Sequence, residues 1–157
     1  MDVPIKKAMK QLDDDIKLFL KQIKDEMAEV QKKVAIIAAE RLVYYSPVWT
    51  GAYVRSMRCG IGVPDSSHES AGSGMMPYPP RMSEAEAEMT RMGTFAKIRA
   101  EIESAPHGEA IYLSNTIPYA MNVEFTGWYL SPDGIDFVQA PHHVFTTTIR
   151  DLEYILK

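Results

Sequence analysis

The chain has 157 residues, about the length of one domain, and its formal net charge of −4 argues against a dedicated nucleic-acid-binding protein, which usually carries a basic surface. The hydrophobic content of 46% and the charged content of 24% are typical of a globular protein. A single cysteine excludes an internal disulfide, no run of 18 apolar residues predicts a membrane span, and the N-terminus has no long apolar stretch, so we expect a protein made in the cytoplasm.

Residues 5–41 carry the clearest periodic signal. Apolar residues recur there at intervals of three and four, close to a heptad repeat, and the series ends in an arginine: Ile5, Met9, Leu12, Ile16, Phe19, Ile23, Met27, Val30, Val34, Ile37 and Arg41. The pattern predicts a long amphipathic helix over residues 3–45, with Asp2 as its N-cap and Pro4 in its first turn.

At 1.5 Å per residue this helix would be about 60 Å long, too long to be covered by the rest of the chain. We therefore expect its N-terminal half to pack on another chain. The alternative is a break near Asp13-Asp14-Asp15, which would give two helices folded within one domain.

Shorter elements follow the proline of Ser46-Pro47, which ends the helix. Large and small residues alternate over 52–62 and predict a strand, whereas 63–80 is rich in Gly, Ser and Pro and predicts a long loop. Ser83 and Glu86 form a capping-box pattern that opens a helix over 83–104, in which Gly93 permits a kink.

The remaining segments predict a strand, a turn, a hairpin and a helix. They are a strand at 109–116, a turn with a short helix or extended piece at 117–128, a hairpin at 129–139 turning at Pro132-Asp133-Gly134, and a terminal helix at 140–156. We expect an α+β fold: a long N-terminal helix (1–45) in the same unit as an α+β domain (46–157), whose small, mostly antiparallel sheet is flanked by two further helices.

Candidate catalytic, cofactor and metal sites do not emerge from the motifs. HExxH, GxxxxGK[ST] and GxSxG are absent from the sequence, and adjacent histidines such as His142 and His143 point about 100° apart on a helix. Cys59 is interpreted as a buried, inert thiol. We expect no enzyme and no cofactor; the rival hypothesis is a small metal-dependent enzyme using Glu124, His142 and His143.

Three blocks carry a resemblance to a known family. "SPVWTGAYVRSM" resembles the S-P-V-(D)-T-G-A signature of tailed-bacteriophage minor tail, tail-completion and neck proteins. "IYLSNTIPYAMNVEF" is similar to the second signature of that family, and "QAPHHVFTTTIRDLEYIL" to its closing segment. The blocks stand in the family's order within residues 30–157. The chain departs from the pattern at Trp49, where the family usually has Asp, and at Thr126, which delays the glycine after Glu124-Phe125 by one residue.

The resemblance implies a structural virion protein that forms a ring, six- or twelvefold, at the head–tail junction. Its partners would be copies of itself, the head–tail connector or adaptor, and tail-tube or terminator proteins. DNA would pass through the central channel without sequence-specific binding, and no membrane would be involved. The protein would be made in the host cytoplasm and reside in the virion neck or tail. The alternative within this class is a tail-terminator protein at the head-proximal end of the tail tube.

Interface candidates follow from the same resemblance and from residue type: Trp49, Tyr53, Arg55, Tyr119, Glu124, Phe125 and Trp128. Trp49 either anchors a partner or folds onto its own core. Glu124 either pairs with Arg55 or Arg58, within the sheet or across a subunit boundary, or is exposed at a strand end. Besides the enzyme, the rival of another class is a cytosolic binding module whose long helix forms a dimeric coiled coil.

Overall fold

A computed structural model describes residues 2–67, 81–130 and 137–157. The elements in chain order are α1 (Asp2–Tyr45), α2 (Ala52–Arg55), β1 (Met57–Ile61), α3 (Glu84–Ser104), β2 (Ile111–Asn115), the π-helical turn η1 (Asn122–Thr126), β3 (Trp128–Leu130), β4 (Phe137–Gln139) and α4 (Val144–Ile155). The predicted α+β class, with its long N-terminal helix and further helices, is confirmed.

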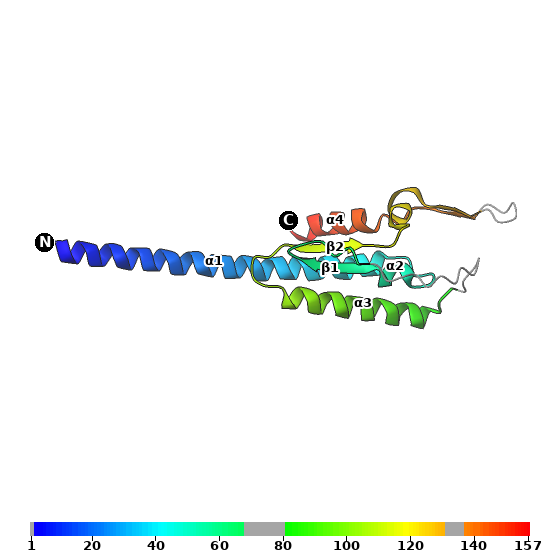
Figure 1. Cartoon of the computed structure of the whole chain (residues 1–157). Coiled ribbons are helices and arrows are strands. Elements are labelled where there is room, and N and C mark those ends of the chain that lie inside the picture. The colour runs from blue at the N-terminus through cyan, green and yellow to red at the C-terminus, as the bar shows by residue number, and fades with distance from the viewer. Residues whose placement is uncertain (1, 68–80, 131–136) are drawn as a thin grey trace.

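Helix α1 runs unbroken for 44 residues, so the alternative of a break at residues 13–15 is wrong. It begins at Asp2, which is therefore a helical residue and not the cap predicted from the sequence. Figure 1 shows that the N-terminal half of α1 extends well beyond the other elements, which gather around its C-terminal half.

The face of α1 that packs on the rest of the chain is rich in alanine. Ala28, Ala38 and Ala39 are buried there, followed by Leu42 and Val43. Small side chains let neighbouring backbones approach closely, while the larger apolar residues of the heptad series lie on a different side of the helix. The periodicity of the large apolar residues in the sequence does not mark this alanine face.

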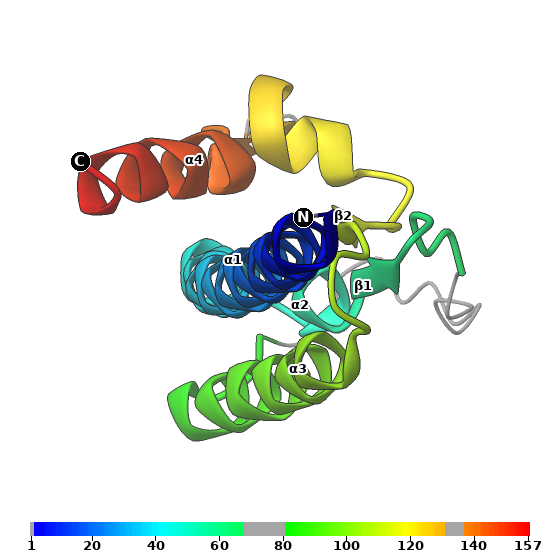
Figure 2. The same cartoon turned by 90° about the vertical axis from the view of Figure 1, so that its left-hand side faces the viewer.

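Helices α3 and α4 lie on opposite sides of α1, and the strands β1 and β2 cover a third side (Figure 2). β1 pairs with β2 in antiparallel fashion, from Met57 opposite Asn115 to Ile61 opposite Ile111. β3 and β4 form a second antiparallel pair, so the predicted small sheet is two separate two-stranded ladders. The core between these layers contains Leu42, Val54, Ile98, Ile102 and Val144.

The predicted strand over residues 52–62 is corrected to one helical turn, α2, followed by a shorter strand, β1. Gly51 has a φ of 78°, and its carbonyl accepts a hydrogen bond from the amide of Arg55 at 3.0 Å. The positive φ favours glycine and reverses the chain into the helical turn. Tyr53 and Val54 are consequently both buried, at 4% and 0% exposure, although a strand would place them on opposite faces.

The prediction for α3 is confirmed down to its cap. The Ser83 hydroxyl accepts a hydrogen bond from the Glu86 amide at 3.3 Å, and the Glu86 carboxylate accepts one from the Ser83 amide at 2.9 Å. Gly93 does not interrupt the helix. The hairpin turn at Pro132-Asp133-Gly134 and residues 68–80 of the predicted loop lie outside the described residues.

Candidate interaction surface

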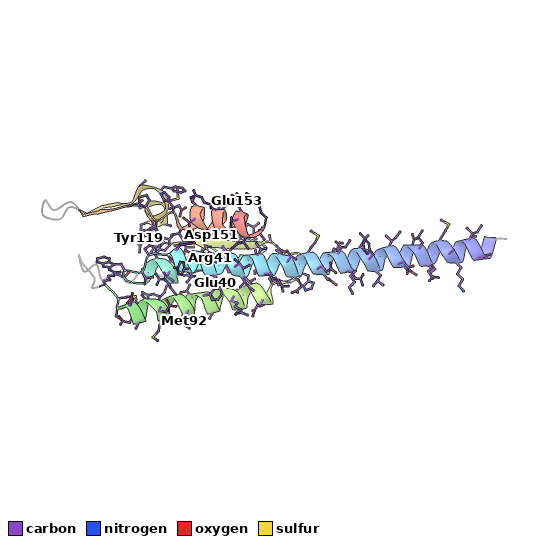
Figure 3. The ribbon with its side chains drawn as sticks, turned by 180° about the vertical axis from the view of Figure 1, so that it is seen from behind. Glu40, Arg41, Met92, Tyr119, Asp151 and Glu153 are labelled. Carbon is purple, nitrogen blue, oxygen red and sulfur yellow. The ribbon has the colours of Figure 1, made fainter. Side chains whose placement is uncertain are left out.

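A long series of exposed apolar side chains follows the N-terminal part of α1. We call it the α1 stripe: Ile5, Met9, Leu12, Ile16, Phe19, Ile23, Met27 and Val30. Every member is at least 37% exposed, and Phe19 is 61% exposed. Large apolar side chains aligned on one helix face are typical of a surface that packs on a partner. Figure 3 shows the N-terminal half of α1 with its side chains pointing outward and no other element beside them.

The contacts that fix α1 to the rest of the chain begin near residue 25. His107 lies between two carboxylates of α1, with its Nδ1 3.3 Å from Asp25 Oδ1 and its Nε2 3.8 Å from Glu29 Oε1. Gln31 Nε2 and Lys32 Nζ then donate to backbone carbonyls, both at 3.0 Å. Most of the α1 stripe therefore lies before the first of these contacts.

Charged residues border the α1 stripe unequally. On one side lies what we call the lysine flank: Lys6, Lys10, Lys17 and Lys24, with Asp13 as its one acid. On the other side lies the carboxylate flank: Asp15, Glu26 and Glu29. These placements follow from 3.6 residues per turn along an unbroken helix.

At the opposite end of α1, Trp49 borders a groove of about 620 Å³, whose wall also includes Tyr44, Arg81, Met82 and Arg91. Trp49 is 50% exposed, and the Arg81 guanidinium lies over its ring, 5.9 Å from the ring centre. The Trp49 carbonyl accepts a hydrogen bond from the Met82 amide at 2.8 Å, which holds the start of α3 against this turn. The Trp49 side chain is therefore half buried, so it is neither a core residue nor a fully exposed one.

Glu124 is 5% exposed and caps helix α4. Its carboxylate accepts hydrogen bonds from the Phe145 amide at 3.0 Å, the Thr146 amide at 2.9 Å and the Thr146 hydroxyl at 2.7 Å. Burial alone would raise the pKa of Glu124, but these hydrogen bonds and the charge of His143 outweigh it, so the pKa lies below its ordinary value. The prediction that Glu124 is exposed at a strand end is wrong. Neither this prediction nor the alternative pairing with Arg55 or Arg58 included a cap of α4.

Two interface candidates belong to the core. Tyr53 packs in the buried cluster, and its hydroxyl has no hydrogen-bond partner within the described part of the chain. Burial, the Glu124 charge and Tyr119 together raise the pKa of Tyr53. The backbone carbonyl of Tyr53 accepts a hydrogen bond from Asn115 Nδ2 at 2.9 Å. Tyr53 and Glu124 are thus buried within the single chain, and their role at an interface stays a prediction.

The other candidates differ in their surroundings. Arg55 is exposed, and its guanidinium donates to the Thr50 carbonyl at 2.8 Å. Tyr119 is partly buried against the core (labelled in Figure 3), and Phe125 is 55% exposed. The side chain of Trp128, in β3, lies outside the described residues.

The groups considered for catalysis have defined surroundings in the structure. Cys59 is buried, as predicted, and burial with the charges of Glu101 and Asp65 raises its thiol pKa to about 11. No three metal-binding side chains cluster in the ranges that the structure covers. Glu124, His142 and His143 lie in one region, but the Glu124 oxygens are engaged by α4, and burial lowers the pKa of His142.

Further exposed apolar residues lie on α4 and α3. Ile149, Tyr154, Ile155 and Leu156 are exposed along and after α4, and Met92 points away from the body on α3 (Figure 3). Arg41 and Asp151 link α1 to α4 at 3.9 Å. The terminal helix predicted over 140–156 is observed as α4, Val144–Ile155, and the sequence pattern does not mark its exposed apolar side.

Among the described residues, none of the helices combines the length and the apolar character that a membrane crossing requires. No protein-family model, curated protein or solved structure matches the chain.

Proposed function

We propose that this chain is a structural protein of a tailed-bacteriophage virion that assembles into a ring at the head–tail junction. In this role it completes the neck or the tail and leaves a central channel through which DNA passes. It acts through contacts with its own copies, with the connector or adaptor, and with tail-tube or terminator proteins.

The observation that carries the proposal is the exposed α1 stripe on a helix that extends beyond its own body (Figure 1). A single copy leaves Leu12, Phe19 and Met27 in water at 59%, 61% and 67% exposure. Covering such side chains in an assembly is favourable by about 1.5–3 kcal/mol for each one fully buried. A chain that leaves this apolar face exposed in isolation fits an assembly component.

The sequence resemblance supports a particular kind of assembly. The turn "SPVWTGAY" shapes the link between α1 and β1, and "NTIPYAMNVEF" leads from β2 into η1. In the structure these blocks contact each other, because Asn115 donates to the Tyr53 carbonyl. The resembling residues therefore form one structural centre that holds α1, β1 and α4 together.

The charge is compatible with a DNA channel. A net charge of −4 gives no strong attraction for phosphate, so a polyanion can slide past such a wall without being held. Ring subunits also need two different faces, since the contact around an axis is head-to-tail. The two sides of the α1 stripe carry unlike charges, lysines on one side and carboxylates on the other, and so offer two such faces.

Electron microscopy of the purified chain tests the proposal. We expect closed rings of six or twelve copies around a channel, either alone or after addition of a head–tail connector. A second candidate, a cytosolic binding module with a dimeric coiled coil, is favoured by the heptad spacing of α1 and would give dimers. Dimers, or monomers that ignore the connector, would contradict the ring.

A further inference from the structure

We propose that the α1 stripe is covered by the α1 stripes of neighbouring copies, with the helices side by side and pointing in the same direction. This inference rests on the proposed function and deepens it, because it names the partner of the α1 stripe and the direction of the contact.

The spacing of the stripe identifies another helix as its partner. Steps of four and three residues alternate from Ile5 to Ile23, which is the period at which two helices stay in contact while coiling around each other. One extra four-residue step, from Ile23 to Met27, shifts the pattern by part of a turn and locally unwinds such a coil. It falls where the body of the chain begins to contact α1, near Asp25 and His107.

The charges around the stripe favour a copy of this chain over a lipid surface or an acidic partner. The segment Ile5–Val30 has no net charge, because it contains equal numbers of lysines and carboxylates. The six lysines are Lys6, Lys7, Lys10, Lys17, Lys21 and Lys24, and the six carboxylates are Asp13, Asp14, Asp15, Asp25, Glu26 and Glu29. Helices that lie on membranes carry a polar face rich in lysine and arginine. A segment without net charge packs on itself without net repulsion.

The unequal flanks determine the direction. When two such helices run the same way, with stripes facing, the lysine flank of each meets the carboxylate flank of the other. When they run in opposite directions, lysine meets lysine and carboxylate meets carboxylate. Charges at the edge of an interface select register and partner more than they add affinity.

Ring symmetry independently demands the same direction. Copies related by rotation about one axis all point the same way along it. The flanks of α1 are therefore arranged as the proposed ring requires.

Disulfide cross-linking tests the direction. Ile5→Cys and Ile23→Cys each place one thiol on the stripe, while the native Cys59 is buried and has a thiol pKa of about 11, so it reacts slowly. We expect each variant to cross-link to itself, and a mixture of the two to contain 5–5 and 23–23 links. Asp14→Cys, on the opposite face of α1, is the control and should remain uncross-linked.

Predominant 5–23 links in the mixture would show helices running in opposite directions and overturn the inference. An absence of links at both positions would overturn it as well. Same-direction links in a dimer would support this inference while contradicting the ring. A ring in which neither position cross-links would do the reverse, so the two proposals fail separately.

Charge exchange tests the flanks. Lys10→Glu with Lys24→Glu changes the net charge of the lysine flank from +3 to −1, so that both flanks are net negative. Asp15→Lys with Glu26→Lys changes that of the carboxylate flank from −3 to +1, so that both are net positive. We expect each pair to raise the concentration needed for half-assembly roughly tenfold, and all four changes together to restore it. Lys7→Glu with Asp14→Lys changes charges on the far face and should have no effect. Unchanged assembly in both flank variants would contradict the proposed contact.

Discussion

Glu124 shows how a single buried charge organises the C-terminal part of the molecule. The first amides of a helix have no partners within it, and a carboxylate placed there satisfies them and complements the helix dipole. Glu124 does this for α4 from a distant position in the sequence, through Phe145 and Thr146. The contact joins η1 to α4 and so ties the second resembling block to the third.

The first prediction concerns this cap. Glu124→Gln should lower the free energy of unfolding by about 1–3 kcal/mol, because an amide nitrogen replaces one acceptor that faces buried donors. Urea denaturation measures the change. Glu153→Gln, at an exposed position of α4, is the matched control and should change the free energy of unfolding by less than about 0.5 kcal/mol. Equal effects would show that the cap is not stabilising.

The pH dependence follows from the same group. The folded-state pKa of Glu124 lies below its ordinary value of 4.5. The contribution of the ionised Glu124 to the free energy of unfolding is therefore complete above pH 4.5 and is lost as the pH falls through the folded-state pKa. The stability difference between the wild type and Glu124→Gln should thus be constant from pH 7 to about 5 and shrink in more acidic solution. A difference that grows on acidification would contradict the assignment of the cap.

The second prediction concerns Trp49. Its ring is half exposed beside Arg81, so Trp49→Ala should weaken assembly at least about tenfold while lowering the free energy of unfolding by less than about 1 kcal/mol. Sedimentation and urea denaturation measure the two effects. Val63→Ala, at a residue that is 70% exposed, should affect neither. Comparable losses of assembly and folding would instead make Trp49 a core residue.

At the scale of elements, α1 serves two purposes with two faces. Its alanine face packs against the rest of the chain, and the α1 stripe is exposed to solvent. The sequence pattern predicted the helix and its exposed half, because a heptad of large residues is a strong signal. It could not predict the packing face, because alanines at positions 28, 38 and 39 give a weak hydrophobic signal and gain their importance only from close packing.

The turn after α1 shows a second limit. Alternation of large and small residues over 52–62 resembles a strand, but Gly51 adopts a left-handed conformation and starts one helical turn. Tertiary contacts decide the outcome, since Asn115 of β2 donates a hydrogen bond to the Tyr53 carbonyl. The same limit applies to Glu124, whose partners lie about twenty residues further along the chain and are not marked by any local motif. In contrast, the capping box of α3 is local and was predicted correctly.

The third prediction uses two glycines, one within α3 and one in the turn between α3 and β2. Gly93 lies within α3, where an added Cβ would meet no atom within 4 Å, so Gly93→Ala should raise the free energy of unfolding by about 0.5–1 kcal/mol. Gly108 has equally open surroundings but a φ of +81°, so Gly108→Ala should lower stability by about 1 kcal/mol. Thermal denaturation compares the two variants. A loss of stability for Gly93→Ala would mean that α3 requires flexibility there.

At the scale of the whole molecule, the structure separates a packed body from an exposed helix half (Figure 1). Folding of the body depends on residues such as Val54, Ile102 and Val144, none of which belongs to the α1 stripe. Folding and assembly should consequently be separable by mutation, because the two processes bury different side chains.

The fourth prediction uses that separation. Ile16→Ser with Phe19→Ser removes two exposed apolar side chains of the α1 stripe and should abolish assembly at concentrations where the wild type is assembled. Unfolding of the body should be unchanged within about 0.5 kcal/mol, since neither residue contacts the core. Loss of folding in this variant would contradict the assignment of the stripe to assembly.

Sedimentation velocity of the wild type and of this stripe variant, over a wide range of protein concentration, tests the central claim most directly. The claim is that the exposed stripe of α1 drives the association of copies into a closed ring. It requires a wild type that associates with rising concentration into one species of six or twelve copies, and a variant that stays a folded monomer throughout. A wild type that remains monomeric at every concentration, or a variant that assembles as well as the wild type, would contradict it.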